Sequence, residues 1–165
     1  MAKEIERKFL VSSEAWREAA SSSAAYMQAY IAIGEDRSVR VRLIDGTSAR
    51  LTIKIGRGTL SRNEYEYDIP VEDAEELVRD AIGTVLEKTR YLVPHAGFTW
   101  EVDVFTGFYH GLVVAEVELQ DEAENPPLPS WIGREVTSDR RYSNMVMATE
   151  DLTGELVHDV SHSAI

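Results

Sequence analysis

The stretch Glu4-Ile5-Glu6-Arg7-Lys8-Phe9 decides how the chain is interpreted, because its charged residues recur at every second position. In an extended strand successive side chains point to opposite faces, so Glu4, Glu6 and Lys8 share one face. That face carries two carboxylates and an ammonium group at close spacing. The question for the rest of the chain is whether such a face recurs.

The same alternation does recur, with aliphatic or aromatic residues between the polar ones. The further pairs are Arg40/Arg42, Thr52/Lys54, Glu64/Glu66, Lys88/Arg90, Glu101/Asp103 and Glu116/Glu118. One strand of this kind is ordinary in a half-buried sheet. So many of them, with both signs of charge in tight clusters, favour a barrel with a charged lumen.

Hydrophobic periodicity and turn residues divide the chain into strands and a few helices. Strands are predicted at 2–11, 24–33, 37–44, 49–55, 62–69, 85–93, 98–105 and 111–120, and helices at 13–20, 71–82 and 139–151. About eight strands with few helices indicate a mainly β (α+β) chain that folds as an antiparallel barrel. We expect a single domain over residues 1–154 and a flexible C-terminal tail over residues 155–165.

Composition places the chain among ordinary globular proteins. Its 165 residues, 44% of them hydrophobic, suffice for one sizeable core. It contains no cysteine, which excludes disulfides and thiolate chemistry and fits a cytoplasmic location. No apolar run approaches the roughly 20 residues of a membrane span, so no membrane partner is expected. The net charge of -12 argues against a nucleic-acid partner, because such binders usually present a basic face.

Two chemically different sets of side chains lie on the predicted strands. The basic set is Lys8, Arg40, Arg42, Lys54, Lys88 and Arg90, with Arg62 as an addition; the acidic set is Glu4, Glu6, Glu64, Glu66, Asp103, Glu116 and Glu118. Arginine forks match phosphate oxygens and lysine adds a compact charge, so such a cluster suits a polyphosphate. Carboxylates two positions apart can share a hard divalent cation, Mg²⁺ or Mn²⁺. The competing interpretation is an exposed sheet face crossed by salt bridges, which is favoured for any single pair and weakened by the whole set.

A resemblance now becomes specific. Glu4-Ile5-Glu6-Arg7-Lys8 matches the ExExK signature of the CYTH family, the triphosphate tunnel metalloenzymes, and the chain resembles this family over about residues 2–150. The further matching segments, in order, are 38–42 (SVRVR), 51–54 (LTIK), 62–66 (RNEYE), 87–91 (EKTRY), Asp103, 116–118 (EVE), 133–137 (GREVT) and 142–144 (YSN).

The resemblance implies an eight-stranded antiparallel tunnel with flanking helices and a C-terminal helix near one mouth. It implies that the basic set grips a triphosphate and that the acidic set holds one or two divalent metals. Glu4, Glu6 and Lys8 are therefore the candidate catalytic residues. Tyr30 joins them because it matches a family tyrosine, although a core aromatic residue is an equally good interpretation of it.

The resemblance leaves several reactions open. The first is a metal-dependent inorganic triphosphatase, in which water attacks a terminal phosphorus. The second is a class IV-type adenylate cyclase, which converts ATP to cyclic AMP and pyrophosphate; the related thiamine triphosphatases are a third. The fourth is a polyphosphate or nucleotide-binding module without turnover. All of these bind a small triphosphate, and a homodimer is the one protein partner left open.

Overall fold

The computed structural model describes residues 3–56 and 61–157 of the chain. A single antiparallel sheet dominates these residues. Its strands are β1 (Lys3–Val11), β2 (Ser22–Ile33), β3 (Arg37–Ile44), β4 (Ser48–Ile55), β5 (Ser61–Ile69), β6 (Ile82–His95), β7 (Phe98–Thr106), β8 (Val113–Glu118) and β9 (Ile132–Glu135). The helices are α1 (Trp16–Ala19), α2 (Val71–Val78), α3 (Asn144–Thr149) and α4 (Thr153–Leu156), with 3₁₀ turns η1 (Gly107–Tyr109) and η2 (Arg140–Tyr142).

The sheet closes on itself through its first strand. The strands are ordered β5-β4-β3-β2-β6-β7-β8-β1-β9, and β5 also pairs with β1, where Glu4 lies opposite Arg62. The other edge of β1 pairs with β8, so that Lys8 lies opposite Glu116. Eight strands therefore form a closed antiparallel barrel, as the sequence predicts, and the short β9 extends it beside the far end of β1.

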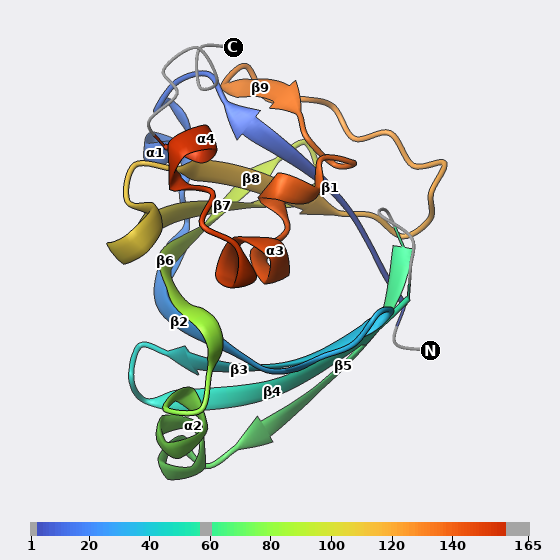
Figure 1. Cartoon of the computed structure of the whole chain (residues 1–165). Coiled ribbons are helices and arrows are strands. Elements are labelled where there is room, and N and C mark those ends of the chain that lie inside the picture. The colour runs from blue at the N-terminus through green and yellow to red at the C-terminus, as the bar shows by residue number, and fades with distance from the viewer. Residues whose placement is uncertain (1–2, 57–60, 158–165) are drawn as a thin grey trace.

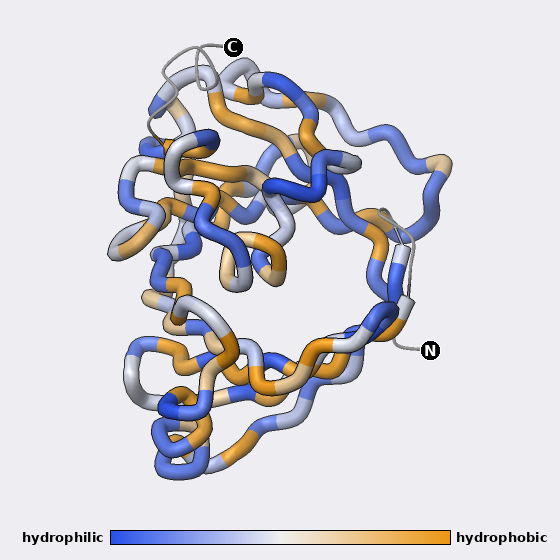
Figure 2. Tube along the Cα trace, in the orientation of Figure 1, coloured by the Kyte–Doolittle hydropathy of each residue, from blue (hydrophilic) through white to orange (hydrophobic). Residues whose placement is uncertain are grey.

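Alternation along the strands decides which residues face the lumen. Figure 2 shows hydrophilic and hydrophobic residues interleaved along β3, β4 and β5. The outward apolar residues of this region, Val41 and Ala49 among them, pack under Ala74 of helix α2. On the opposite side of the barrel, Trp16, Trp100 and Trp131 belong to a second buried cluster. The charged residues are left on the inner face.

Helix α3 lies inside the ring of strands rather than outside it (Figure 1). It packs against apolar residues that continue the inward-facing series of several strands, because Leu10 follows Lys8 by two positions and Leu86 precedes Lys88 by two. Phe105 and Val114 continue the inward series of β7 and β8 in the same way. One end of the barrel is therefore filled by an apolar core that includes Met147 of α3.

The predicted helix over 139–151 is wrong in its extent. Residues Arg140–Tyr142 form a 3₁₀ turn, and Ser143 is extended, with ψ of 128°, before α3 begins. The predicted helix over 71–82 ends at Val78, and strand β6 begins at Ile82. Strand β9 was not predicted, because its four residues acquire their pairing only from β1. These elements depend on tertiary contacts rather than on local periodicity.

The predicted tail over 155–165 lies mostly beyond the described residues. Its first residues belong to helix α4, and Leu156 is buried in the core that contains α3. Residues 158–165 lie outside the described ranges, so the flexibility of the tail and the single-domain boundary at 154 stay predictions. Across residues 3–56 and 61–157, none of the helices is long and apolar enough to cross a membrane.

Candidate active site

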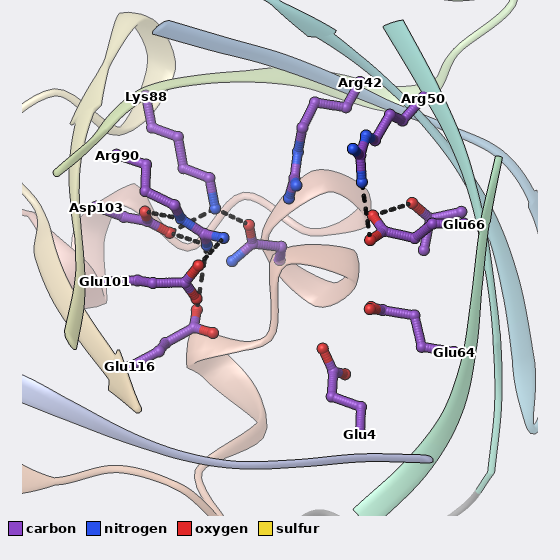
Figure 3. Close-up of polar contacts among 12 residues, drawn as sticks. Glu4, Arg42, Arg50, Glu64, Glu66, Lys88, Arg90, Glu101, Asp103 and Glu116 are labelled. Carbon is purple, nitrogen blue, oxygen red and sulfur yellow. Dashed lines mark hydrogen bonds and ion pairs between the residues drawn. The ribbon is translucent and has the colours of Figure 1, made fainter. Parts of the chain in front are cut away.

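The barrel encloses a cavity of about 750 Å³, lined by inward-facing side chains of its strands and by the segment that leads into α3. Figure 3 shows labelled side chains from β1, β3, β4, β5, β6, β7 and β8 pointing into this common space. The sequence-predicted residues that line it are Glu4, Glu6, Lys8, Tyr30, Arg40, Arg42, Lys54, Arg62, Glu64, Glu66, Lys88, Arg90, Glu116 and Glu118. Residues far apart in the sequence thus meet in one place, as the tunnel interpretation requires.

Asp103 was predicted as a metal ligand, and in the structure it contacts two basic side chains. It is buried beneath the cavity wall, and both of its oxygens are occupied, because Oδ2 accepts from Lys88 Nζ at 2.6 Å and Oδ1 from Arg90 Nε at 2.7 Å. A second bond from Arg90 makes that contact bidentate. Burial alone would raise the pKa of Asp103, but Arg90 and Lys88 hold it below its ordinary value. Asp103 is thus the anionic anchor for two cations.

Arg40 and Arg42 form the basic section of the wall on β3. Both are buried, and Arg42 stacks over the ring of Tyr26 at 4.3 Å. Burial lowers the pKa of Arg42 to about 9, and repulsion from Arg40 and Arg90 adds to the effect. The Nε of Arg40 is buried without a hydrogen-bond partner among the described residues. An anion in the cavity would relieve the repulsion between these guanidinium groups.

Carboxylates gather on the side of the cavity formed by β1, β5 and the end of β8. Lys54 Nζ lies 3.1 Å from Glu4 and 3.4 Å from Glu64. Burial raises the pKa of Glu64 to about 7, and Glu4 contributes to the rise. Burial also raises the pKa of Glu118, again with Glu4 and with Glu66 as repelling neighbours. The pKa shifts of Glu64 and Glu118 show that repulsion among these carboxylates persists beside Lys54.

The chemistry of this cluster fits a hard divalent cation. Among the described residues, however, no three acidic or imidazole groups converge closely enough to hold an ion by themselves. This is the pattern expected for Mg²⁺, which is usually bound through one or two carboxylates while water and substrate phosphates complete its coordination. The donor set therefore suits a cation that binds together with a phosphate ligand.

Glu6, Glu116 and Lys8 connect the basic and acidic sides of the wall. Burial beside Glu116 raises the pKa of Glu6 well above its ordinary value. Burial would also raise the pKa of Glu116, but Lys8 and Arg90 hold it well below the usual range. Lys8 Nζ donates to the carbonyl of Tyr142 at 2.8 Å, so the ammonium group of this strand is tied to the segment before α3.

Tyr30 fits the core interpretation at least as well as a catalytic one. It is 5% exposed and belongs to the apolar cluster around α3, although it reaches the cavity edge. Its strand is irregular there, because the pairing with β3 shifts register between Tyr30 and Ala32. Its predicted catalytic role stays a prediction.

Three residues that line the cavity were not among the predicted site residues. Glu101 pairs with Arg90 at 3.2 Å, and its position two residues before Asp103 was the available signal. Arg50 lies 3.5 Å from Glu66 and continues the inward series of Thr52. Asn144 also lines the cavity, and no strand periodicity could have indicated it, because it begins a helix.

The CYTH domain model matches residues 2–149. The chain belongs to the CYTH domain family. This CYTH domain is 48% identical over 145 residues to an inorganic triphosphatase of Acetivibrio thermocellus, covering 87% of this chain and 92% of that protein. It is 39% identical over 150 residues to an inorganic triphosphatase of Nitrosomonas europaea, covering 88% and 96%.

A solved structure supports the same relationship in three dimensions. The CYTH domain superposes on the crystal structure of an inorganic triphosphatase with a TM-score of 0.64 and 34% sequence identity. The match covers 91% of this chain and 97% of the other. Because nearly the whole length of both chains is matched, the fold of this CYTH domain is shared with that triphosphatase.

Proposed function

We propose that this protein is a metal-dependent triphosphatase that hydrolyses the terminal phosphate of inorganic triphosphate or of another small triphosphate. The observation that carries the proposal is a single cavity in which the buried, mutually repelling Arg40 and Arg42 share space with the carboxylates of Glu4, Glu64 and Glu118. A polyanion and a divalent cation that bind together compensate both excesses of charge.

In this proposal the basic residues bind the phosphate chain. Arg40, Arg42 and Arg90 would contact its oxygens and stabilise the charge that these oxygens carry in the transition state. Lys8, Lys54 and Arg62 complete this set on the neighbouring strands. Arg90 is oriented for the task because Asp103 holds its Nε and one terminal nitrogen.

The carboxylates would hold the cation and position water. We assign the cation to the cluster of Glu4, Glu64 and Glu118, of which one or two would be direct ligands while phosphate and water complete the coordination. The other predicted carboxylates, Glu6, Glu66 and Glu116, lie around this cluster, and Asp103 is assigned as the anchor described above. Mg²⁺ or Mn²⁺ bound there would neutralise phosphate oxygens and increase the acidity of water. The site supplies no cysteine, and the proposal requires no protein nucleophile.

The relatives support hydrolysis over the alternative reactions. The Acetivibrio thermocellus and Nitrosomonas europaea proteins are both named inorganic triphosphatases. A cyclase would need an adenine and ribose pocket, and the described lining of the cavity is dominated by charged side chains. Thiamine triphosphate is an alternative substrate within the same reaction class, and binding without turnover is the alternative that an assay excludes directly.

The deciding experiment is an assay of phosphate release from inorganic triphosphate, ATP and thiamine triphosphate, each with Mg²⁺, with Mn²⁺ and with a chelator. We expect metal-dependent release that is fastest with inorganic triphosphate. Cyclic AMP and pyrophosphate from ATP would replace the proposal with cyclase chemistry. Tight binding of triphosphate without release, in a folded sample supplied with metal, would identify a binding module instead.

A further inference from the structure

A buried hydrogen-bond chain connects the basic wall of the cavity to helix α3. It begins at Arg42, whose Nε donates to Gln28 Oε1 at 2.7 Å. Gln28 lies on β2, is fully buried, and belongs to neither the basic nor the acidic set. Because its oxygen accepts from Arg42, its amide nitrogen is turned the other way, and it donates to Asn144 Oδ1 at 3.0 Å.

A second chain reaches the same oxygen from the opposite direction. Lys88 Nζ donates to Asn144 Oδ1 at 2.8 Å and to Asp103 Oδ2 at 2.6 Å. Asp103 in turn accepts both bonds of Arg90. The side chains of Arg42 and Arg90 are therefore connected through one side-chain oxygen on α3. Because two donors point at this position, only a hydrogen-bond acceptor placed there can satisfy both of them.

The burial of Lys88 favours a role through the side chains that it contacts. Its side chain is only 1% exposed, so its ammonium group is shielded from a ligand in the cavity by the groups that it contacts. All three residues line the cavity, but the Arg90 side chain is 10% exposed and Arg42 is 8% exposed, so both arginines are more accessible than Lys88. The predicted substrate-binding role of Lys88 stays a prediction, and its bonds to Asn144 and Asp103 give it a further role in holding the arginines.

The arginines need such a support because they repel each other. Arg40 and Arg90 both act to lower the pKa of Arg42, which means that their charges disfavour its own. The support is firm because α3 is fixed independently, with Met147 buried and its carbonyl accepting from Tyr109 Oη at 2.6 Å. A loose acceptor would not hold two donors in place.

We propose that Asn144 is a positioning residue of the site, which holds Arg42 through Gln28 and Arg90 through Lys88 and Asp103 in the orientation that receives the phosphate chain. This inference rests on the proposed function, because it takes a triphosphate as the ligand of the two arginines. It assigns to the segment entering α3 a role in substrate binding that the strand pattern did not indicate.

The test compares Asn144→Ala with wild type in steady-state hydrolysis of inorganic triphosphate with Mg²⁺, and in calorimetric binding of inorganic triphosphate in the presence of a chelator. We expect KM and Kd to rise about tenfold, the equivalent of one lost hydrogen bond to a charged group, while kcat changes much less. The effect should shrink in the Arg42→Ala background, because some of it is transmitted through Arg42.

Two further variants separate positioning from simple loss of stability. Thr149→Ala perturbs the same helix, since the Thr149 hydroxyl donates to the carbonyl of Met145, but it removes no contact to the arginines. It should leave KM and Kd unchanged. Gln28→Leu interrupts the chain from the strand side and should reproduce the rise in KM even if Asn144→Ala folds poorly.

The outcomes separate this inference from the proposed function. If the rises in Kd caused by Asn144→Ala and Arg42→Ala multiply fully in the double variant, Asn144 does not act through Arg42. If Asn144→Ala and Gln28→Leu both bind triphosphate like wild type, Asn144 does not position the arginines. If wild type binds triphosphate but does not hydrolyse it, the proposed function fails while the binding constants still test the inference. If wild type binds triphosphate neither with the chelator nor with Mg²⁺, both fail.

Discussion

At the scale of single residues, Glu4 has the most direct influence on the carboxylate side of the cavity. It lies 3.1 Å from Lys54, and its charge raises the pKa of both Glu64 and Glu118. A side chain that repels two neighbouring carboxylates is costly unless a cation offsets the repulsion. Glu4 is therefore the residue at which the metal proposal can be tested most cleanly.

We expect Glu4→Gln to reduce kcat for inorganic triphosphate by at least about a hundredfold, the order attributed to one electrostatic group of an active site. The fold should survive, because the amide keeps the size of the side chain and removes repulsion. Phosphate release at saturating Mg²⁺ measures the effect. The matched control is Glu14→Gln, which breaks only an exposed pair with Arg17 and should be silent. Full activity in Glu4→Gln would remove Glu4 from the metal site.

At the scale of elements, the strands show why the sequence was informative. A period of two places Glu4, Glu6 and Lys8 on one face without knowledge of any partner strand. The same period also carries Leu10 inward, and there the lumen ends in an apolar core. The strand pattern thus indicated that one end of the lumen is apolar. It could not indicate that α3 fills this end, because that depends on where a helix distant in the sequence packs.

The sequence was least informative for residues whose roles depend on contacts across elements. Asp103 has the parity of a lumen residue, and only its register opposite Arg90 shows that it serves as an anchor. Asn144 has no periodic signal at all, because its role depends on reaching Gln28 and Lys88 from α3. Local alternation predicted which faces are charged, whereas the division of labour among the charges required the folded barrel.

The contact between β6 and α3 gives a prediction at this scale. Gly83 has φ of +71°, and a Cβ on it would lie 2.0 Å from the carbonyl oxygen of Ala148 in α3. Gly83→Ala must therefore displace the helix backbone, and we expect it to lower the free energy of unfolding by about 2–4 kcal/mol. Urea denaturation measures the loss.

The control for this prediction is Gly46→Ala in the β3–β4 hairpin. Gly46 has a similar φ of +68° but no atom within 4 Å of the position of an added Cβ. It should show only the backbone cost of about 1–2 kcal/mol. Equal losses in the two variants would mean that β6 and α3 do not approach each other as closely as the structure has them.

At the scale of the whole molecule, an acidic protein must accommodate a polyanion. The chain carries a net charge of -12, yet basic and acidic side chains are equally numerous in the described cavity lining. The negative surplus therefore lies elsewhere on the protein, where solvent screens it. Acidic and basic side chains are balanced within the cavity itself, so the proposed cation and phosphate chain would each meet a cluster of opposite sign.

This balance makes the stability of the metal-free protein depend on pH. The fold raises the pKa of Glu64 from an ordinary 4.5 to about 7, so it favours the protonated group. Protonation of Glu64 therefore contributes to the free energy of unfolding. This contribution is fully present below about pH 4.5, decreases as the pH rises towards 7, and is absent above that pH. A divalent cation reverses the loss only where the carboxylate is ionised.

We therefore expect Mg²⁺ or Mn²⁺ alone to raise Tm clearly at pH 8 and very little at pH 5.5, by about 2–4 °C for each kcal/mol of binding free energy gained. Differential scanning calorimetry without phosphate measures the shift, and K⁺ at equal ionic strength controls for screening. Glu64→Gln should reduce the shift at pH 8, because it removes the titrating ligand. Equal shifts of Tm at both pH values would show that the cation does not bind at Glu64. The repulsion among the carboxylates of this cluster would then not be explained by metal binding.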